Sequence, residues 1–156
     1  MSSDVPGFEL PLRLLLAFRT LIDELHAELS KQGHPDIRPM HGFVMQAIGP
    51  GGTTAVELGR TLGVSKQAAG KTIDTLERIG YVERTTDPGD TRRKIVRLTP
   101  YGLDALNRSA RIFDTLRTRW ATELGEDRLR ALESDLRKVT PANPWRLDMP
   151  GWFGSL

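Results

Sequence analysis

Residues 53–99 read TTAVELGRTLGVSKQAAGKTIDTLERIGYVERTTDPGDTRRKIVRLT, and this stretch predicts two short helices followed by a hairpin. Thr54 and Glu57 fit a capping box at the start of the first helix, and Gly63 breaks that helix. Ser65 fits the N-cap of the second helix. The apolar positions are Val56, Leu58 and Leu62 in the first helix and Ala69, Ile73, Leu76 and Ile79 in the second. Two helices joined by a tight glycine turn are typical of a helix-turn-helix, whose second helix enters the DNA major groove.

A basic hairpin is expected directly after the second helix. Residues 81–84 and 94–98 have the pattern of two short strands, and Asp-Pro-Gly-Asp at 87–90 fits a type II turn. The connection between these strands is longer than an ordinary hairpin loop, and loops of that kind are often functional. Its return arm carries Arg92, Arg93 and Lys94. A cationic hairpin beside a recognition helix is a wing that can contact phosphates or the minor groove.

These motifs together resemble those of the MarR family of bacterial transcriptional regulators. The matching segments are LGVSKQ at 62–67, LERIGYV at 76–82, DTR at 90–92, VRLT at 96–99, and Gly102. The resemblance implies a dimeric winged-helix protein that binds an operator and is released by a small ligand or by oxidation. A helix-turn-helix followed by a basic wing in register is much more specific than a helix-turn-helix alone.

The rest of the chain predicts helices. Apolar periodicity and end signals place them at about 10–32, just after Pro39, at 100–124 and at 126–139. The expected fold is therefore mainly α with a small β-hairpin wing: a winged helix-turn-helix flanked by N- and C-terminal dimerisation helices. The expected domains are an N-terminal dimerisation helix at 1–36, a DNA-binding domain at 37–100, and C-terminal dimerisation helices with an aromatic tail at 101–156.

The terminal helices are too apolar for a winged domain of about 60 residues to bury alone. In the family that the chain resembles, these helices intertwine across a two-fold axis, which predicts a homodimer. The alternative is a bundle within one chain. The tail carries Trp145, Trp152 and Phe153 among prolines and glycines, and we expect it to pack across a partner subunit.

The charge distribution agrees with a nucleic-acid partner. The formal net charge of all 156 residues is only +2. Residues 60–97 alone hold nine basic and five acidic side chains, a net of +4, so the remainder is −2. Positive charge is thus concentrated where the motifs lie, although solvated surface charge is the alternative interpretation.

Several classes of protein are not expected. The chain has no cysteine, which excludes disulfides, thiolate metal sites and an oxidation-sensing thiol. No apolar run approaches the length of a membrane helix, and Arg13 interrupts the apolar segment near the N-terminus, so we expect no membrane association and a cytoplasmic location. We expect neither enzymatic activity nor a cofactor.

Helix phase predicts which side chains face DNA. If Ala69 and Ile73 face the core, Gln67 and Lys71 face outward, and Arg78 can pair with Asp74 four residues earlier. Base edges are expected near Gln67, Lys71 and Thr72, and phosphates near Ser65 and Lys66 at the positive helix end. The resemblance implies that Asp90 orients an arginine while Arg92 enters the minor groove. The predicted DNA contacts are Thr54, Ser65, Lys66, Gln67, Lys71, Thr72, Asp90, Arg92, Arg93 and Lys94.

Two alternative sites are considered. Gly70-Lys71-Thr72 matches the end of a phosphate-binding P-loop, but residue 65 is serine where the motif needs its first glycine, and the segment predicts a continuous helix. A metal-responsive regulator would use His26, His34 and His41, with Glu24 or Asp36 as an oxygen ligand. None of these histidines has close metal-ligand spacing, so solvent-facing or structural histidines are the preferred interpretation.

The resemblance also implies an effector pocket between the dimerisation helices and the winged domain. The side chains expected to line it are Met40, His41, Phe43, Met45 and Trp120. The same side chains would also make an ordinary core, and the identity of an effector does not follow from the sequence.

Overall fold

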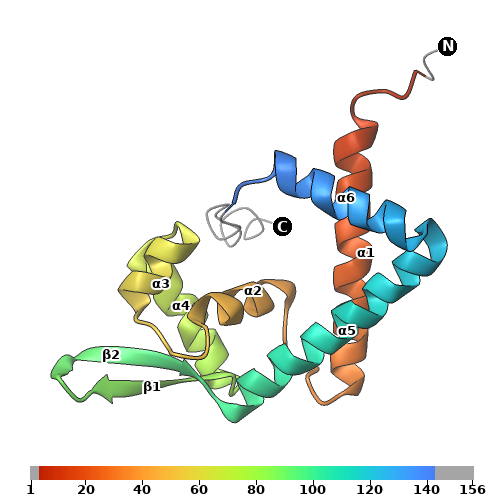
Figure 1. Cartoon of the computed structure of the whole chain (residues 1–156). Helices are drawn as coiled ribbons and strands as arrows, with labels where there is room; N and C mark the ends of the chain where they lie inside the picture. Colours follow the sequence, from red (N-terminus) through yellow and green to blue (C-terminus); the bar gives the residue numbers. More distant parts are fainter. Residues whose placement is uncertain (1–3, 143–156) are drawn as a thin grey trace.

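The computed structural model describes residues 4–142, which form six helices and one antiparallel hairpin (Figure 1). The elements are α1 (Glu9–Lys31), α2 (Pro39–Ile48), α3 (Ala55–Leu62), α4 (Lys66–Arg78), β1 (Val82–Asp87), β2 (Asp90–Leu98), α5 (Pro100–Leu124) and α6 (Glu126–Val139). The expected class, mainly α with a β-hairpin wing, is confirmed.

Local capping explains where the helices begin and end. The hydroxyl oxygens of Thr54, Ser65 and Thr99 accept hydrogen bonds from backbone N–H groups three residues later, at 3.2, 3.0 and 3.1 Å. These bonds satisfy amides that have no partner inside the helix. Gly63 ends α3 with φ of 73°, in the left-handed region that glycine adopts without strain. The turn between α3 and α4 is therefore determined by residues within it.

The core lies where α2, α3, α4, the hairpin and the first half of α5 meet. Ala69, Ile73 and Leu76 of α4 are buried there, in the phase expected from their spacing. Leu58 and Leu62 bury the inner face of α3, whereas Val56 is 40% exposed because it lies on the opposite face of that helix. Other buried members are Val44, Met45, Ile48, Tyr81, Val82, Val96 and Ala105.

The hairpin differs from the expected one. Its strands extend to the turn, so the connection holds only Pro88 and Gly89 rather than a long loop. Asp87 accepts a hydrogen bond from the Gly89 N–H at 2.9 Å, and Gly89 is not among the positive-φ glycines of the described chain, so the turn is not type II. Residues 91–93 lie between the ladder partners of Thr86 and Asp87, which makes a bulge in β2.

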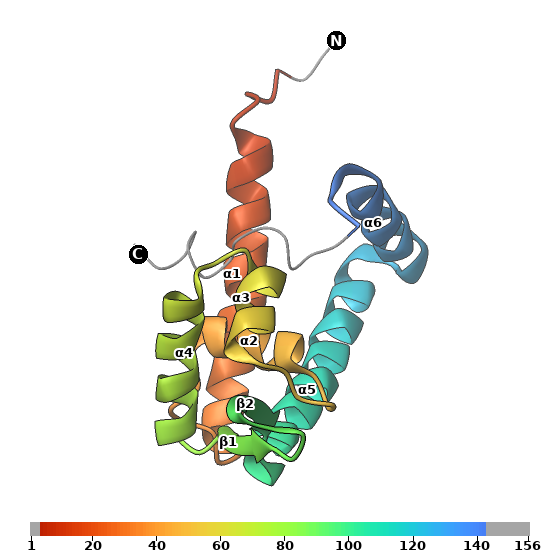
Figure 2. The ribbon, with the colours of Figure 1, turned by 90° about the vertical axis from the view of Figure 1, so that its left-hand side faces the viewer.

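The long helices form the other part of the molecule. The second half of α1 packs on α5 and buries Ile22, Leu25 and Leu29, whereas its first turns project away from the other elements (Figure 2). Helix α6 packs against the end of α5 that lies away from the wing (Figure 2). Arg117 of α5 binds Glu133 of α6 at 2.6 Å. No helix within residues 4–142 has the length and apolarity needed to cross a bilayer.

Candidate nucleic-acid interface

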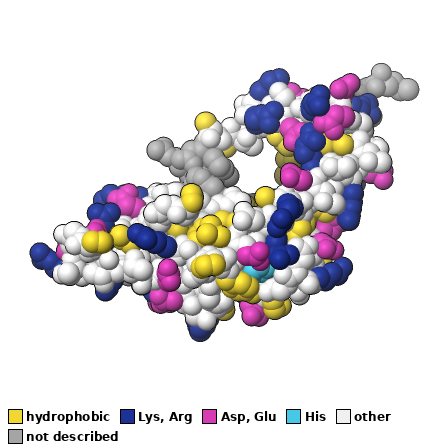
Figure 3. Space-filling model, turned by 60° about the horizontal axis from the view of Figure 1, so that its bottom comes forward, with side chains coloured by type: hydrophobic (Ala, Val, Ile, Leu, Met, Phe, Trp, Pro, Cys, Tyr) yellow, Lys and Arg dark blue, Asp and Glu magenta, His cyan; other side chains and the backbone are white. Residues whose placement is uncertain are grey.

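A groove of about 790 Å³ lies between α3, the start of α4 and the wing. Seven of the ten predicted DNA contacts line it: Thr54, Lys66, Gln67, Asp90, Arg92, Arg93 and Lys94. The wing projects from the body of the molecule, and Lys and Arg side chains lie at its free end (Figure 3). Segments up to 40 positions apart in the sequence therefore meet at one cationic surface, as a nucleic-acid site requires.

The start of α4 supplies one wall of this groove. Ser65, Lys66 and Gln67 lie in its first turn and are exposed. The backbone amides and the dipole of a helix start favour an anion there. Lys71 is exposed one turn later, while Thr72 is half-buried and its hydroxyl donates to the Ala68 carbonyl at 3.3 Å. Ser65, Lys71 and Thr72 are the three predicted contacts that do not line the groove.

The start of α3 is tied to the wing directly. The N–H of Thr53 donates to the carbonyl of Val96 at 2.9 Å, and the N–H of Val96 donates back at 2.7 Å. This bridge adds one pair at the edge of β2 that lies away from β1, and it places Thr54 beside β2. Sequence spacing alone did not indicate the pairing, because the two residues are far apart along the chain.

The basic side chains of the wing differ in their exposure and in their hydrogen-bonding partners. Arg92 is 95% exposed, and its backbone N–H donates to the Asp90 carboxylate at 3.0 Å while its Nε lies 3.8 Å from the same oxygen. Arg93 lies 3.8 Å from Asp87, and Lys94 donates to the Thr86 hydroxyl at 2.9 Å. Arg92 is therefore the wing cation that extends furthest into solvent, with Asp90 beside its base.

Arg84 is a residue of this surface that sequence reasoning missed. From β1 it reaches α4, where it binds Asp74 at 2.7 Å and Glu77 at 3.0 Å. The predicted pair of Arg78 with Asp74 is wrong, because Arg84 takes that carboxylate and is better shielded from water, with 27% of its side chain exposed. This bridge joins the wing to α4 and pairs one cation with two acidic groups of that helix. Periodicity within one helix could not reveal it.

Neither alternative site is supported. Gly70, Lys71 and Thr72 lie inside α4, so their amides are engaged in helix bonds and cannot curl around a phosphate. Within residues 4–142, no group of three or more acidic, histidine or cysteine side chains could hold a metal ion. His34 has protein partners on both ring nitrogens, and His41 accepts from the Arg38 N–H at 3.1 Å.

The space expected for an effector is small. A cavity of about 40 Å³, room for about one water molecule, lies between α1, α2 and α5. Phe43 lines it, together with His26, whose Nδ1 is buried without a partner among the described residues. Met40, His41 and Trp120 do not line this cavity, and Met45 is fully buried in the core. Trp145, Trp152 and Phe153 of the tail lie outside the described residues.

The fold and this surface define a class: a helix-turn-helix with a basic wing, joined to long helices at both ends of the chain. Residues 36–93 match the model of the MarR family. The curated relative is an uncharacterized HTH-type transcriptional regulator, YcgE of Bacillus subtilis (strain 168), which is 44% identical over 53 residues. That match spans 34% of this chain and 33% of the relative.

Solved structures agree over most of the chain. A mutant of MarR from E. coli complexed with operator DNA is 29% identical, with a TM-score of 0.64, over 89% of this chain and 100% of that one. FabT of Streptococcus pneumoniae in complex with DNA gives a TM-score of 0.72 at 18% identity, over 86% of this chain and 94% of that one, and shows the shared fold. Residues 36–93 thus match the MarR family, and structures of MarR from E. coli share the fold over most of the chain at 27–29% identity.

Proposed function

We propose that this protein is a transcriptional repressor that binds a pseudo-palindromic operator as a homodimer. The observation that carries the proposal is the groove in which α3, α4 and the wing bring together seven of the predicted contacts. The FabT and mutant MarR structures described above hold DNA, and the MarR mutant is 29% identical to this chain. A dimer seated on an operator would block transcription by occupying the DNA.

The charges of the groove support DNA rather than an acidic protein as its occupant. Its cations come from three elements: Arg60 from α3, Lys66 from the start of α4, and Arg84, Arg92, Arg93 and Lys94 from the hairpin. A duplex presents phosphates on both sides of its major groove. Helix α4 would enter that groove with Gln67 and Lys71, while Arg92 of the wing reaches the neighbouring minor groove.

The exposed apolar surface of α1 supports the homodimer. Leu10, Leu14, Leu15 and Leu16 are 43–69% exposed in the single chain. A helix that is apolar on all sides is normally buried on all sides. We keep the division into residues 1–36, 37–100 and 101–156, in which the first and last parts pair with a second copy and the middle part contacts DNA.

Release by a small molecule is the last part of the proposal. The cavity between α1, α2 and α5 is too small for more than about one water molecule. A larger ligand would therefore have to move α2 away from the long helices, and α2 packs directly on α3. Such a ligand would change the position of the DNA-binding surface. A protein that binds an operator must reach the chromosome, so we propose a cytoplasmic location.

Selection of a bound duplex from a random-sequence pool tests the proposal. Fluorescence anisotropy then gives the affinity for the selected duplex between 50 and 200 mM salt, where six phosphate contacts would lower it about 1,000-fold. Replacing Arg92, Arg93 and Lys94 by alanine should flatten this dependence. Replacing Arg128, Arg137 and Lys138 of α6, which removes the same charge, should not. Failure to select any duplex would refute the proposal.

A further inference from the structure

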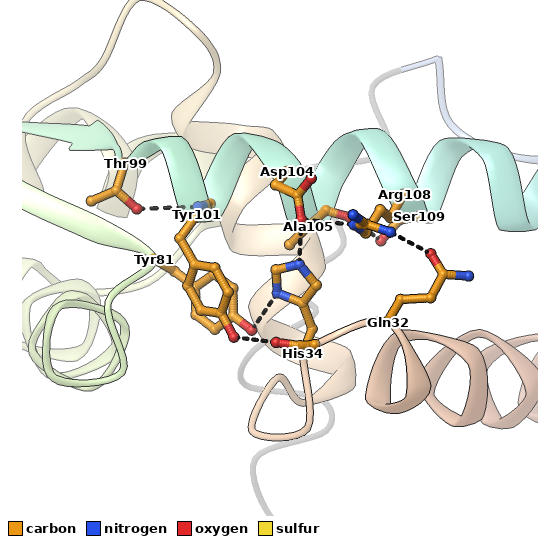
Figure 4. A network of polar contacts seen from close by, with 11 residues as sticks. Gln32, His34, Tyr81, Thr99, Tyr101, Asp104, Ala105, Arg108 and Ser109 are labelled. Atoms are coloured by element: carbon orange, nitrogen blue, oxygen red, sulfur yellow. Dashed lines mark hydrogen bonds and ion pairs between the residues drawn. The ribbon is translucent and has the colours of Figure 1, made fainter.

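A cluster of polar and aromatic side chains joins the winged domain to the long helices (Figure 4). We call it the His34 cluster. Its members are Gln32, His34, Tyr81, Tyr101, Asp104 and Arg108. They come from the segment after α1, from the junction of α4 with β1, and from α5. None of them lines the proposed DNA groove, so the proposed function does not explain why they are held together.

His34 lies at the centre of this cluster. It is 1% exposed, its Nδ1 lies 2.9 Å from the Tyr81 hydroxyl, and its Nε2 lies 2.7 Å from a carboxylate oxygen of Asp104. A buried imidazole needs partners for both nitrogens, because an unpaired polar atom in the interior is costly. His34 therefore joins the end of α4 to α5 through two bonds that neither helix can make alone.

The direction of the bond to Asp104 is defined. The hydrogen bond from His34 and the one from Arg108 lower the pKa of Asp104, so this carboxylate stays ionised and only accepts. His34 thus donates to Asp104 from Nε2, and its Nδ1 is hydrogen-bonded to the Tyr81 hydroxyl. Burial raises the pKa of Tyr81 well above its ordinary value, so that hydroxyl stays protonated.

Tyr81 connects the cluster to the recognition helix. Its N–H donates to the carbonyl of Leu76, in the last turns of α4, at 2.9 Å, and its own carbonyl accepts from the Thr99 N–H at 3.0 Å. Gly102 of α5 lies so close that a Cβ there would overlap the carbonyl oxygen of Tyr81. The end of α4 is thereby held against the start of α5, with no side chain between the two backbones at this point.

Tyr101 and Arg108 close the cluster on either side of His34. The Tyr101 ring stacks on the His34 ring with centroids 4.4 Å apart, and its hydroxyl donates to the Gly33 carbonyl at 2.5 Å. Arg108 donates to Asp104 at 2.8 Å and to the Gln32 side chain at 3.1 Å. The chain segment that follows α1 is thus bound to α5 on both sides of the histidine.

The cluster lies at one end of α4, so a small rotation there displaces the other end of the helix. The helix has 13 residues and is roughly 20 Å long, with the cluster at one end and Gln67 at the other. A rotation of about 10° at Tyr81 would move the other end by about 3.4 Å, which is the rise of one base pair. In a symmetric dimer both recognition helices would move, so the distance between them depends strongly on the angle at Tyr81.

We propose that the His34 cluster fixes the angle of α4 to the long helices and thereby sets the half-site spacing that the dimer accepts. His34 is in this account a positioning residue, because it acts on DNA through Tyr81 and α4. The inference rests on the proposed function, since spacing has a meaning only for a dimer on two half-sites.

The experiment compares operators that differ only in spacing. Duplexes carry the selected half-sites with the centre-to-centre distance changed by −2, −1, 0, +1 and +2 base pairs, and a further duplex carries one half-site. Affinities are measured for the unmodified protein, His34→Gln and Tyr81→Phe. Tyr81→Phe keeps the aromatic ring in the core and removes only the hydroxyl that bonds His34. It therefore tests the same contact if His34→Gln does not fold. His26→Gln, on α1 outside the cluster, is the matched control.

The unmodified protein and His26→Gln should lose about tenfold in affinity for each base pair of misplacement. His34→Gln and Tyr81→Phe should lose less than about threefold, while their affinity for one half-site stays within about twofold. A spacing profile identical to that of the unmodified protein would overturn the inference, even if the melting temperature fell. Equal weakening on every duplex would also overturn it, because a purely structural role predicts that result. If the unmodified protein binds no duplex at all, both this inference and the proposed function are refuted.

Discussion

The winged domain and the long helices differ in how far their apolar side chains are covered within the chain. In α3, α4 and the hairpin, the large apolar side chains other than Val56 are buried or half-buried within the chain, and the outer surface is charged. In α1 and α6, large apolar side chains remain exposed, including Leu10 at 69%, Leu15 at 49% and Val139 at 80%. The winged domain therefore shares a covered core with the adjoining parts of α1 and α5, whereas the first half of α1 and α6 keep apolar side chains exposed.

This difference separates two tasks. A domain whose apolar side chains are mostly covered within the chain can present a charged surface to another molecule, because little apolar area there needs cover. Helices with uncovered apolar faces need a second set of helices, and an identical chain provides one through two-fold symmetry. In our account the winged domain contacts DNA, and the long helices set how two winged domains are spaced.

The largest predicted effect comes from the first half of α1. Leu12→Glu with Leu16→Glu places two carboxylates on one face of the helix, where both leucines are exposed in the single chain at 41% and 45%. Each buried leucine contributes about 2 kcal/mol. The dissociation constant of the dimer should rise by about 1,000-fold. Operator affinity should fall with it, as measured by sedimentation and by anisotropy.

Ala27→Glu with Ser30→Glu is the matched control, since it adds the same charge to exposed positions in the second half of α1. The control should remain a dimer. Dimerisation should also make the melting temperature of the unmodified protein rise with protein concentration. A double leucine variant that still sediments as a dimer would show that these residues are not the interface.

The wing should give the next largest effect. Arg92→Ala should weaken operator binding by about 1–3 kcal/mol, the loss typical of one good groove contact. Asp90→Ala should also weaken it, although it removes a negative charge, because the arginine loses its neighbouring carboxylate. Arg128→Ala on α6 removes the same positive charge and should leave affinity unchanged. Tighter binding by Asp90→Ala would mean that net charge, not orientation, governs the wing.

A smaller effect is expected from substitutions in α4, which should distinguish contacts to DNA bases from contacts to the DNA backbone. Gln67→Ala and Lys71→Ala should reduce the preference for operator over random DNA by about 1 kcal/mol or more. Lys66→Ala should weaken binding to both by similar factors and lower the salt slope by about one. Lys66 and Lys71 form a matched pair, because both are exposed lysines of α4. Equal losses on operator and random DNA for all three variants would place the recognition surface elsewhere.

The smallest predicted effect is on stability in mild acid. Burial lowers the pKa of His26 and, together with nearby Arg38 and His26, that of His41. Both groups titrate near 6.5 when unfolded, so the fold favours their neutral forms. Their contribution is complete above about pH 6.5 and is lost as the pH falls through the lower folded pKa. The melting temperature should be flat from pH 8 to 7 and fall by a few degrees toward pH 5.

His26→Gln with His41→Gln should flatten this dependence, because the titrating groups are then absent. A melting temperature that rises on acidification would show that the folded pKa values are raised instead. Measurements above pH 5 leave most carboxylates ionised, so that the histidines dominate the change.

The features that the sequence predicted correctly are those with local causes. The caps at Thr54, Ser65 and Thr99 and the burial phase of α4 follow from residues three or four positions apart. The turn at 87–90 was placed correctly but given the wrong type, because the Asp87 side chain, rather than a positive φ at Gly89, makes the turn. The strands were predicted too short, since polar residues of a projecting hairpin lack the alternation of a half-buried strand.

The features that the sequence could not predict join distant segments. Arg84 binds Asp74 across ten positions, and His34 binds Asp104 across seventy. Neither pair follows a helix or strand period, so only the three-dimensional arrangement reveals it. Of the ten predicted DNA contacts, seven line the groove, while Ser65 at the N-cap of α4 and Lys71 and Thr72 further along that helix do not.

Hydroxyl-radical footprinting of the selected operator tests the central claim most directly. A dimer whose long helices space two winged domains should protect two symmetric patches about one helical turn, 34 Å, apart. The same experiment with the Leu12→Glu and Leu16→Glu variant should show weak protection without this symmetry. A single continuous or asymmetric footprint from the unmodified protein would contradict the account, because two DNA-binding domains held by one dimer cannot produce it.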